Sequence, residues 1–508
     1  MKTQRAIAAK RAAGRSAAAP AAVRAQIEPE FVGKTYDDFL FRPHKGVVGT
    51  RREVSLHSRL TADIGLELPV LSANMDSVTA GAMAKTMALE GGIGFVHRGM
   101  SIEAQAREVA GVKRSHGFVV EEPFRLPRGT RLREAREFIR QHSTSLLVEE
   151  ERGSGVLAGL LTARDLPWFD GYDDRPVEEF MTPVERLHTR RPGIGLEEAE
   201  RVLFENRIEK LPLIDERRRI HGLITKRDVI LHRHRPHVSK DAKGRLLAGA
   251  AVGATGDYLE RAAALLEAGA DVLLIDIAHA HSDVMARGVE SFRAAHPGVP
   301  LVCGNVGTAE GALFLRDLGV DAIKVGVGPG RGCRTRLETA AGVPQLQAIR
   351  EAWCAVGDEI PIIADGGVKD DKDLFLAIVC GASTVMMGSA LSGTDEAPGR
   401  VIVEPATGQK RKIYRGMTSP QAVLEALYGA EDRDVEAALE TPAEGQETQV
   451  AYRGSVVDIL NRIRGHLRSA VSYAGGDSLA EVRERIVREP LGHLIPLSEA
   501  SRRESYER

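Results

Sequence analysis

The sequence carries a series of short apolar runs, and most of them end in glycine or in a polar residue. Most runs are apolar at successive positions, which is typical of strands buried on both faces of a parallel sheet. Helical patterns lie between most of them, for example at Ala262–Ala268 and Ala309–Leu318. In chain order the runs are Val70–Met75, Ile93–Val96, Leu247–Gly253, Val272–Asp276, Leu301–Asn305, Ile323–Val327, Pro361–Asp365 and Thr384–Gly388.

Eight such runs separated by helices predict an α/β fold, namely a TIM (β/α)8 barrel. An open, doubly wound parallel sheet is the alternative. In both folds ligands bind at the carboxyl ends of the strands, because the loops that carry polar groups gather there. Six run ends carry Asn74, Asp276, Asn305, Gly328, Asp365 and Gly388. We therefore expect the functional site at that end.

A region of different character separates the second run from the third and contains an internal repeat. The segment GLLTARD at 159–165 recurs as GLITKRD at 222–228. A helical pattern and an apolar strand precede each copy, at Arg131–His142 with Leu146–Val148 and at Leu196–Glu205 with Leu211–Ile214. Two β-α-β-β-α units of this kind predict a separate inserted domain.

Composition excludes several classes of function. The 508 residues have a formal net charge of −2, which gives no whole-chain reason to expect nucleic acid binding. No apolar run approaches the roughly 20 residues of a membrane span. The four cysteines, Cys303, Cys333, Cys354 and Cys380, lack C-x-x-C spacing, which argues against a zinc site or a disulfide framework and favours a reducing compartment, here the cytoplasm.

The two ends of the chain differ from the rest. Residues 1–27 are alanine-rich and basic and contain no Asp or Glu, so we expect a disordered tail over residues 1–28, with a transit peptide as the alternative. The last residues carry the charged run SRRESYER at 501–508, which predicts a frayed tail over 486–508.

One loop at the expected site carries a cysteine among glycines. The segment GPGRGCRT at 328–335 follows the run Ile323–Val327, so Cys333 is expected in a turn at the end of a strand, where a thiol can meet a substrate. A packed, inert loop cysteine is the alternative. The nearby Arg331, Arg334 and Arg336 favour the thiolate, or are solvated charges or phosphate ligands.

Two further loops predict a phosphate site. Asp365-Gly366-Gly367 ends the seventh run and Gly388-Ser389 the eighth, and in TIM barrels the loops after the last two strands commonly hold phosphate. Glycines allow backbone N–H groups to approach an anion closely. Asp365 is placed to accept hydrogen bonds from a ribose diol. A nucleotide attacked by a thiol fits this combination.

With these features the chain resembles the IMP dehydrogenase/GMP reductase family over about residues 31–480. The matching segments are TYDDFLFRP at 35–43, LPVLSANMDSVT at 68–79, GGIGFVHRGMSIEAQAREVAGVKR at 91–114, DIAHAHS at 276–282, GNVGT at 304–308, GPGRGCRTR at 328–336, ADGGVKDDKD at 364–373, MMGSALSGTDEAPG at 386–399 and YRGM at 414–417. The repeat at about 118–234 resembles a pair of CBS modules, inserted as in the dehydrogenases.

The resemblance implies roles for matching positions. Cys333 resembles the nucleophile that attacks the purine, Thr335 and Glu444 a proton relay, and Arg433 the arginine that activates water. The implied substrate residues are Met75, Asn305, Arg331, Asp365, Gly366, Gly367, Gly388, Ser389, Tyr414, Gly416, Met417 and Glu444. The implied NAD residues are Asp276, Ala278, His279 and Gly326. Potassium is implied at the carbonyls of Gly328, Gly330 and Cys333, and adenine or guanine nucleotides at Thr162, Asp165, Thr225 and Asp228.

The same resemblance implies a domain plan. After the tail, the barrel occupies residues 29–117 and 235–485, with a catalytic loop at 328–345 and a flap at 400–450. The CBS pair occupies 118–234, divided into about 118–172 and 176–234. Family members with this architecture are tetramers or octamers, so we expect a homo-oligomer.

Departures from the family pattern leave the reaction open. Arg331 stands where the family usually has a phosphate-binding serine, and Arg334 replaces a common threonine. The flap reads EDRDV at 431–435, so Arg433 lacks the usual tyrosine neighbour. The length of the flap and DIAHAHS favour NAD-dependent oxidation of IMP to XMP. GMP reduction to IMP with NADPH is the first alternative, and a catalytically impaired nucleotide sensor is the second.

Overall fold

The computed structural model describes residues 27–114, 119–120, 123–142, 145–169, 171–234, 237–422 and 443–506. These residues divide into two compact units. The larger unit contains the chain up to Lys113, residues 237–241 and the chain from Leu247 onward, and the smaller one contains the inserted residues between them, with 242–246.

The larger unit is built around a closed parallel barrel, which confirms the predicted TIM barrel. Its strands follow one another in the order β13-β14-β15-β16-β17-β18-β4-β5, and each overlaps one of the predicted runs. Their bounds are β4 (Val70–Ser72), β5 (Ile93–Val96), β13 (Gly249–Val252), β14 (Val272–Asp276), β15 (Leu301–Val306), β16 (Ala322–Val325), β17 (Ile362–Asp365) and β18 (Thr384–Met387).

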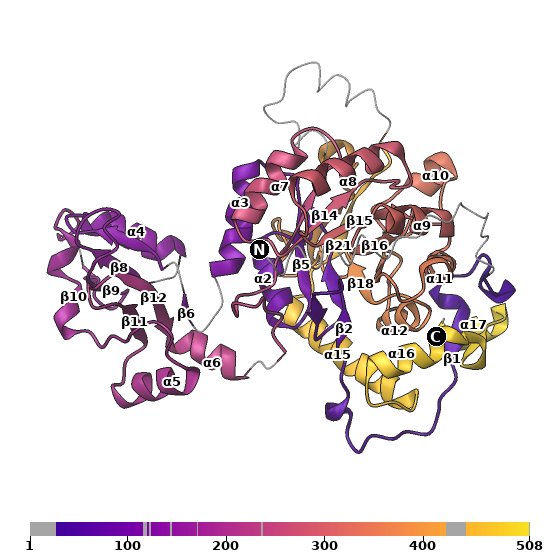
Figure 1. Ribbon diagram of the computed structural model, residues 1–508, viewed down its shortest axis with the longest axis horizontal. Coiled ribbons are helices and arrows are strands. Elements are labelled where there is room, and N and C mark those ends of the chain that lie inside the picture. Colours follow the sequence, from indigo (N-terminus) through magenta and orange to yellow (C-terminus); the bar gives the residue numbers. More distant parts are fainter. Residues whose placement is uncertain are drawn as a thin grey trace. The chain divides into compact units, whose positions relative to one another are not determined.

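Helices follow the strands and cover the outside of the barrel (Figure 1). They are α2 (Gly81–Leu89), α3 (Ile102–Arg114), α7 (Tyr258–Glu267), α8 (Asp283–Ala295), α9 (Ala309–Asp317), α11 (Gln345–Val356) and α12 (Asp371–Val379). α7 to α9 present their apolar stripe to the strands, as Leu265, Phe292 and Leu315 show, each fully buried.

The alternation of side chains along each strand determines which residues point into the barrel interior. Leu274, Ala322 and Ile363 point inward and form part of a continuous apolar core. Because side chains repeat every second residue on one face of a strand, the next inward positions toward the carboxyl end share that direction. Those positions are Asp276, Lys324 and Asp365. A charged layer therefore closes the apolar interior at this end.

The prediction of a frayed carboxyl-terminal tail is wrong. α15 (Val456–Tyr473) and α16 (Leu479–Arg488) lie beside α12 (Figure 1). β22 (Leu494–Pro496) pairs antiparallel with β1 (Phe39–Phe41), and α17 (Glu499–Tyr506) follows. Two residues of the charged run hold it in the fold: the Tyr506 hydroxyl donates to the Phe39 carbonyl at 2.7 Å, and Arg502 pairs with Asp38.

At the amino end, residues 1–26 lie outside the described part of the chain. Glu28, the last residue of the predicted tail, is held in the fold. Its carboxylate accepts two hydrogen bonds from the guanidinium of Arg350, at 2.9 and 2.5 Å, and that side chain is 3% exposed. No helix among the described residues is long and apolar enough to cross a membrane.

The smaller unit contains two similar halves, in agreement with the sequence repeat. One half has a sheet ordered β10-β9-β8-β7 and the other a sheet ordered β11-β12-β6. Their elements are β6 (Val119–Val120), β7 (Arg125–Pro127), α4 (Leu132–His142), β8 (Leu146–Glu149), β9 (Leu157–Leu161), β10 (Thr182–Pro183), α5 (Leu196–Glu205), β11 (Lys210–Ile214), β12 (Ile220–Thr225) and α6 (Lys226–His234).

The repeated Thr-x-x-Asp segments form the same side-chain hydrogen bond in both halves. The Thr162 hydroxyl donates to the Asp165 carboxylate at 2.8 Å, and the Thr225 hydroxyl donates to the Asp228 carboxylate at 2.6 Å. Thr162 follows β9 and begins a turn, whereas Thr225 ends β12 and Asp228 lies in the first turn of α6. The two copies therefore share this hydrogen bond, although only the second continues directly into a helix.

Candidate active site

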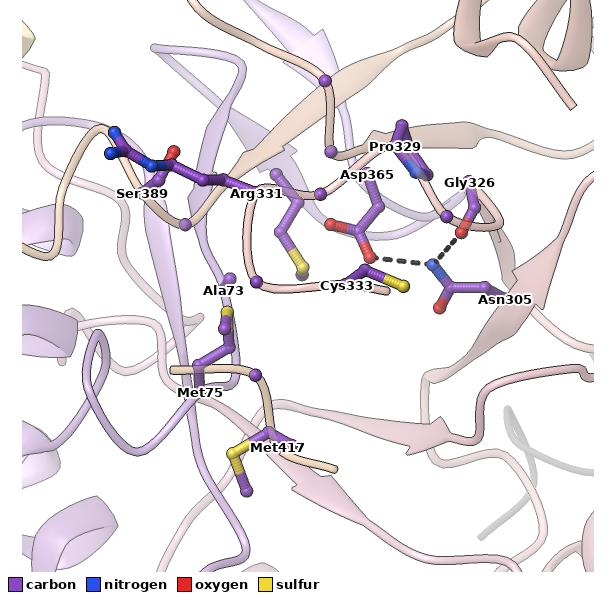
Figure 2. A pocket seen from close by; sticks show the side chains of 18 of the residues that line it. Ala73, Met75, Asn305, Gly326, Pro329, Arg331, Cys333, Asp365, Ser389 and Met417 are labelled. Carbon is purple, nitrogen blue, oxygen red and sulfur yellow. Dashed lines mark hydrogen bonds between the residues drawn. The ribbon is translucent and has the colours of Figure 1, made fainter. Parts of the chain in front are cut away.

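A cavity of about 700 Å³ opens at the carboxyl ends of the barrel strands. It lies where the run ends predict a site, and Figure 2 shows Cys333, Asn305 and Asp365 facing it together. The predicted site residues that line it are Met75, Asp276, Ala278, Asn305, Gly326, Gly328, Gly330, Arg331, Cys333, Thr335, Asp365, Gly366, Gly367, Gly388, Ser389, Tyr414, Gly416, Met417 and Glu444.

Two predicted residues do not take part in this description. His279 is exposed and does not line the cavity, and its ring faces that of His281 with centroids 6.3 Å apart. The sequence places it near the site because it follows β14 closely, but the chain has by then turned toward α8. Arg433 lies outside the described residues.

The cysteine loop is folded back on itself and joined to a distant segment. Gly328 has φ +81°, a backbone conformation that favours glycine, and the Cys333 amide donates to the Gly330 carbonyl at 3.0 Å. Cys333 also forms a bridge with Gly445, through hydrogen bonds from Arg334 N to Glu444 O and from Gln446 N to Gly332 O. These backbone hydrogen bonds therefore fix the position of the Cys333 thiol.

This bridge completes a chain of hydrogen bonds that starts at the thiol. The Cys333 Sγ–H donates to Thr335 Oγ1 at 3.2 Å, and the Thr335 hydroxyl donates to Glu444 Oε2 at 2.6 Å. Thr335 begins the short helix α10 (Thr335–Thr339), whereas Glu444 precedes β21 (Glu447–Ala451). A proton leaving the thiol thus has a direct path to a carboxylate, as an activated nucleophile requires.

The three arginines of the loop have different surroundings. Arg334 pairs with Glu338 at 2.6 Å, and Arg336 donates to the carbonyls of Val327 and Val343. Both therefore stabilise the loop, and the charge of Arg336 also interacts with Cys333. The Arg331 guanidinium has no hydrogen bond or ion pair with a described residue, and it extends toward Ser389 (Figure 2).

A network of four polar residues lies at the floor of the cavity. Asn305 Nδ2 donates to the Gly326 carbonyl at 2.7 Å and to Asp365 Oδ2 at 2.9 Å (Figure 2). Lys324 Nζ lies 2.7 Å from the same Asp365 oxygen and 2.9 Å from Asp276 Oδ1. Asp365 Oδ1 has no hydrogen bond to any described residue, so it is available to a ligand.

Small residues shape the part of the cavity predicted to bind phosphate. Gly366 and Gly367 have φ of +90° and +79°, and a Cβ on Gly388 would lie 3.1 Å from the Tyr414 hydroxyl. Tyr414 is 3% exposed, and burial raises the pKa of its phenol, which therefore stays protonated. Its hydroxyl contacts Met75 Sδ at 3.6 Å.

A second set of polar residues supports the loop at Met417. Arg415 pairs with Asp76 at 2.7 Å, and the Asp76 amide donates to Met417 Sδ at 3.3 Å. His97 is 6% exposed beside these residues, and burial lowers its pKa to about 4, so it is neutral. Its Nδ1 accepts a hydrogen bond from Gly99 N at 3.1 Å.

The sequence alone did not identify several lining residues. Lys324 belongs to the charged floor, beside the run end Asn74 that the sequence did identify, and Arg98, Lys369 and Arg453 add cations at the wall. A lone lysine inside the apolar run at 322–327 was the available signal, because a buried ammonium requires partners. No group of three or more His, Cys, Asp or Glu side chains within the described ranges is arranged to hold a metal ion.

Comparisons with known proteins agree with this geometry. Residues 33–507 match the IMP dehydrogenase / GMP reductase domain family. Curated relatives include the inosine-5'-monophosphate dehydrogenase of Nitrosopumilus maritimus, 42% identical over 461 residues, which cover 89% of this chain and 94% of the relative. The enzyme of the same name from Streptococcus pyogenes is 43% identical over 459 residues, with coverage of 89% and 91%.

Among solved structures, a GMP reductase variant from Trypanosoma brucei in complex with guanosine 5'-monophosphate superposes with a TM-score of 0.85. It is 38% identical, and the match covers 93% of this chain and 97% of that one. A structure of the same reductase in complex with guanosine 5'-triphosphate gives a TM-score of 0.75 at 34% identity and covers 92% and 98%.

Proposed function

The chain belongs to the IMP dehydrogenase/GMP reductase family, and we propose that it catalyses the NAD-dependent oxidation of IMP to XMP in guanine nucleotide synthesis. The observation that carries this proposal is the chain of hydrogen bonds from Cys333 through Thr335 to Glu444, which opens on a nucleotide-sized cavity. The dehydrogenase names of the curated relatives favour oxidation of IMP over reduction of GMP.

The first step is attack by sulfur on the purine. The thiol of Cys333 passes its proton through Thr335 toward Glu444, and the thiolate adds to C2 of IMP, forming the C–S bond. Loss of hydride from that carbon restores the C=N bond and leaves a thioimidate on Cys333. Water then adds to this carbon, the C–S bond breaks, and XMP and the free thiol are released.

The hydrolytic water must lose a proton during that last step. We propose Arg433 as the base that takes this proton, by resemblance, while Glu444 returns the proton of the first step through Thr335 to the leaving sulfur. Thr335 is hydrogen-bonded to both the sulfur and the carboxylate, so the same relay serves attack and release.

Substrate binding is assigned to the network and the glycine loops. We propose that Asp365 Oδ1 accepts a ribose hydroxyl and that Met75, Gly416 and Met417 contact the base. The backbone amides of Gly366, Gly367 and Gly388, with the Ser389 and Tyr414 hydroxyls, suit the 5'-phosphate. Arg331 adds a cation to that end, in place of the neutral serine of the family pattern.

The cofactor side of the cavity is assigned to Asp276, Ala278 and Gly326, and NAD+ supplies the hydride acceptor there when bound. The fit rests on Asp276, whose carboxylate lines the cavity and is held by two donors, Asn74 at 2.6 Å and Lys324 at 2.9 Å. Oxygen ligands suit potassium, so we propose that ion at the carbonyls of Gly328, Gly330 and Cys333.

The inserted unit is proposed to be a CBS pair that binds adenine or guanine nucleotides. The matched Thr162–Asp165 and Thr225–Asp228 pairs support this, because each presents a carboxylate at the end of a strand. We further propose a homotetramer or octamer. The four cysteines are free thiols, and a catalytic thiol must stay reduced, which favours the cytoplasm.

A second candidate function is reduction of GMP to IMP with NADPH. The flap segment at 431–435 lacks the tyrosine that dehydrogenases carry, and the relay of Thr335 and Glu444 also serves deamination. The solved relative that binds guanosine 5'-monophosphate has the same fold over 93% of this chain.

Trapping the intermediate tests the proposed function. The protein is mixed with IMP and NAD+, quenched in acid, digested and analysed by mass spectrometry, and the nucleotides are separated by chromatography. We expect a purine adduct on the peptide containing Cys333, together with XMP. The Cys333→Ala variant should give neither product. XMP formation by that variant, or an adduct on another cysteine, would overturn the mechanism.

A further inference from the structure

Lys324 is the most deeply buried charged group of the cavity. Its side chain is 3% exposed and points into the barrel from β16. An isolated ammonium is costly to bury, so its position depends on the two carboxylates that it contacts, at 2.7 Å and 2.9 Å. Burial lowers the pKa of this ammonium, but the two carboxylates together outweigh burial and raise the pKa above its ordinary value, so Lys324 stays charged throughout the physiological range.

The two carboxylates face different parts of the cavity. Asp365 ends β17 and is proposed to bind the ribose of IMP, whereas Asp276 ends β14 and is proposed to bind NAD+. Each is also held by an amide, because Asn305 donates to Asp365 and Asn74 donates to Asp276. Lys324 is the group that contacts both carboxylates, so a displacement at one of them changes the hydrogen bonding at the other.

The backbone around Lys324 gives its stem a fixed place. Gly304 is its partner across the ladder between β15 and β16, and a Cβ on that glycine would lie 2.5 Å from the Cβ of Lys324. Because Gly304 has no side chain, the stem of Lys324 fits at this position, where a Cβ on residue 304 would collide with it. The stem is thus fixed, and the ammonium at its end lies between two acceptors.

We propose that Lys324 is a positioning residue that couples the two halves of the cavity, so that IMP bound at Asp365 tightens the binding of NAD+ at Asp276. The physical reason is ordering: a ribose hydroxyl on Asp365 fixes that carboxylate and the ammonium, and the second ligand then meets an Asp276 that is already held. The inference rests on the proposed assignment of substrate and cofactor to the two carboxylates.

Equilibrium binding tests the coupling. In the full-length Cys333→Ala protein, which cannot turn over, the Kd for NAD+ is measured by calorimetry without IMP and with saturating IMP. The two values should differ by at least about 5-fold, the lower end of typical coupling between sites. In Cys333→Ala with Lys324→Met the ratio should fall to about one. If that protein does not fold, Lys324→Gln, which keeps a donor and removes the charge, carries the same expectation.

Two control variants separate coupling from general damage. Lys324→Arg keeps the charge between the carboxylates and should retain a ratio above one. Lys113→Met removes a different buried lysine of the same unit that also lies between two aspartates, and it should leave the ratio unchanged. A structural defect alone would raise the Kd for NAD+ equally with and without IMP. The ratio of the two Kd values would then equal that of the Cys333→Ala parent.

Two results would overturn the inference. A ratio of one in the Cys333→Ala parent means that the sites are not coupled, and this result needs no lysine variant. A ratio that persists without the Lys324 charge assigns the coupling to direct contact between the ligands. Failure of the proposed function is a separate result: the unmodified protein would then turn over GMP with NADPH instead, and the ratio would be measured with that pair.

Discussion

Lys324 and Lys113 are both 3% exposed and both lie between two aspartates, but they stand at opposite ends of the barrel strands. Lys113, at the end of α3, contacts Asp241 and Asp271 at 2.8 Å each. The Asp271 side chain is 14% exposed and also accepts a hydrogen bond from Ala248 N, whereas Asp276 and Asp365 are 23% and 20% exposed and line the cavity. The same set of charges therefore stabilises the fold at one end and is open to ligands at the other.

The two ion clusters differ in whether both carboxylate oxygens of an aspartate, Asp271 or Asp365, are hydrogen-bonded by the protein. At the amino end, burial raises the pKa of Asp271 even though Lys113 opposes the shift. Both carboxylate oxygens of Asp271 accept hydrogen bonds from Lys113, and Oδ2 also accepts one from Ala248 N. At the carboxyl end, Asp365 keeps an oxygen that no described residue binds. A buried ion cluster becomes a binding site when one of its acceptors remains open to a cavity.

Removing the nucleophile at the open end should have the largest effect. Cys333→Ala is expected to lower kcat by roughly 10⁴-fold or more, because no other group forms the covalent intermediate. The unfolding temperature should stay close to that of the parent, since the thiol is partly exposed. Steady-state kinetics and thermal unfolding are measured together, and retained turnover would contradict the account.

Removing the cation at the closed end should affect stability and leave catalysis intact. Lys113→Met removes the buried ammonium that Asp241 and Asp271 both contact and should lower the free energy of unfolding by about 3–5 kcal/mol. Urea unfolding gives this value, and kcat/KM of the folded protein should be unchanged. Arg488→Met is the matched control, because its pair with Glu484 is about two-thirds exposed and should change stability by less than ~1 kcal/mol. Equal stability of the two variants would contradict the assignment of Lys113.

Interrupting the proton relay should have an intermediate effect. Glu444→Gln keeps the shape of the side chain but removes the carboxylate that accepts from Thr335, and we expect kcat to fall by about 100-fold or more. KM for IMP is measured as well, because the family resemblance also implies that Glu444 contacts the substrate, and it lines the cavity. A fall in kcat without any change in the pH profile would show that Glu444 has only a structural role.

Much of the open end could be predicted from the sequence, for a physical reason. Asp276, Asn305 and Asp365 end apolar runs, and the carboxyl ends of parallel strands meet in one place. Lys324 escaped prediction because it lies within a run, where its neighbours dominate the pattern. The contact of Glu444 with Thr335 joins positions 109 residues apart and entered only through the family resemblance.

The carboxyl terminus shows the opposite error. Its charges predicted a solvated tail, but Leu494 and the hydroxyl of Tyr506 anchor the segment to β1. Charge density describes the exposed face of an element and does not reveal a few contacts on the other face. The same limit applies to Glu28, whose partner Arg350 is distant in the sequence.

The smallest predicted effect concerns pH. The pKa of His97 is about 4 in the fold and near 6.5 when unfolded, so the unfolded chain binds the extra proton between these values. Stability should therefore decline as pH falls from 6.5 toward 4, by up to about 1.4 kcal/mol per pH unit from this group. His97→Asn keeps an acceptor for Gly99 N and should flatten that part of the profile. An identical slope in the variant would assign the decline to other groups.

If this chain oxidises IMP through Cys333, absorbance at the reduced-nicotinamide band must rise when the protein is given IMP and NAD+. Purified protein with potassium is followed in one cuvette with IMP and NAD+ and in a second with GMP and NADPH. We predict a rise in the first cuvette, no change in the second, and no rise in the first with Cys333→Ala. A fall in the second cuvette without a rise in the first would contradict the claim and assign the chain to reduction of GMP.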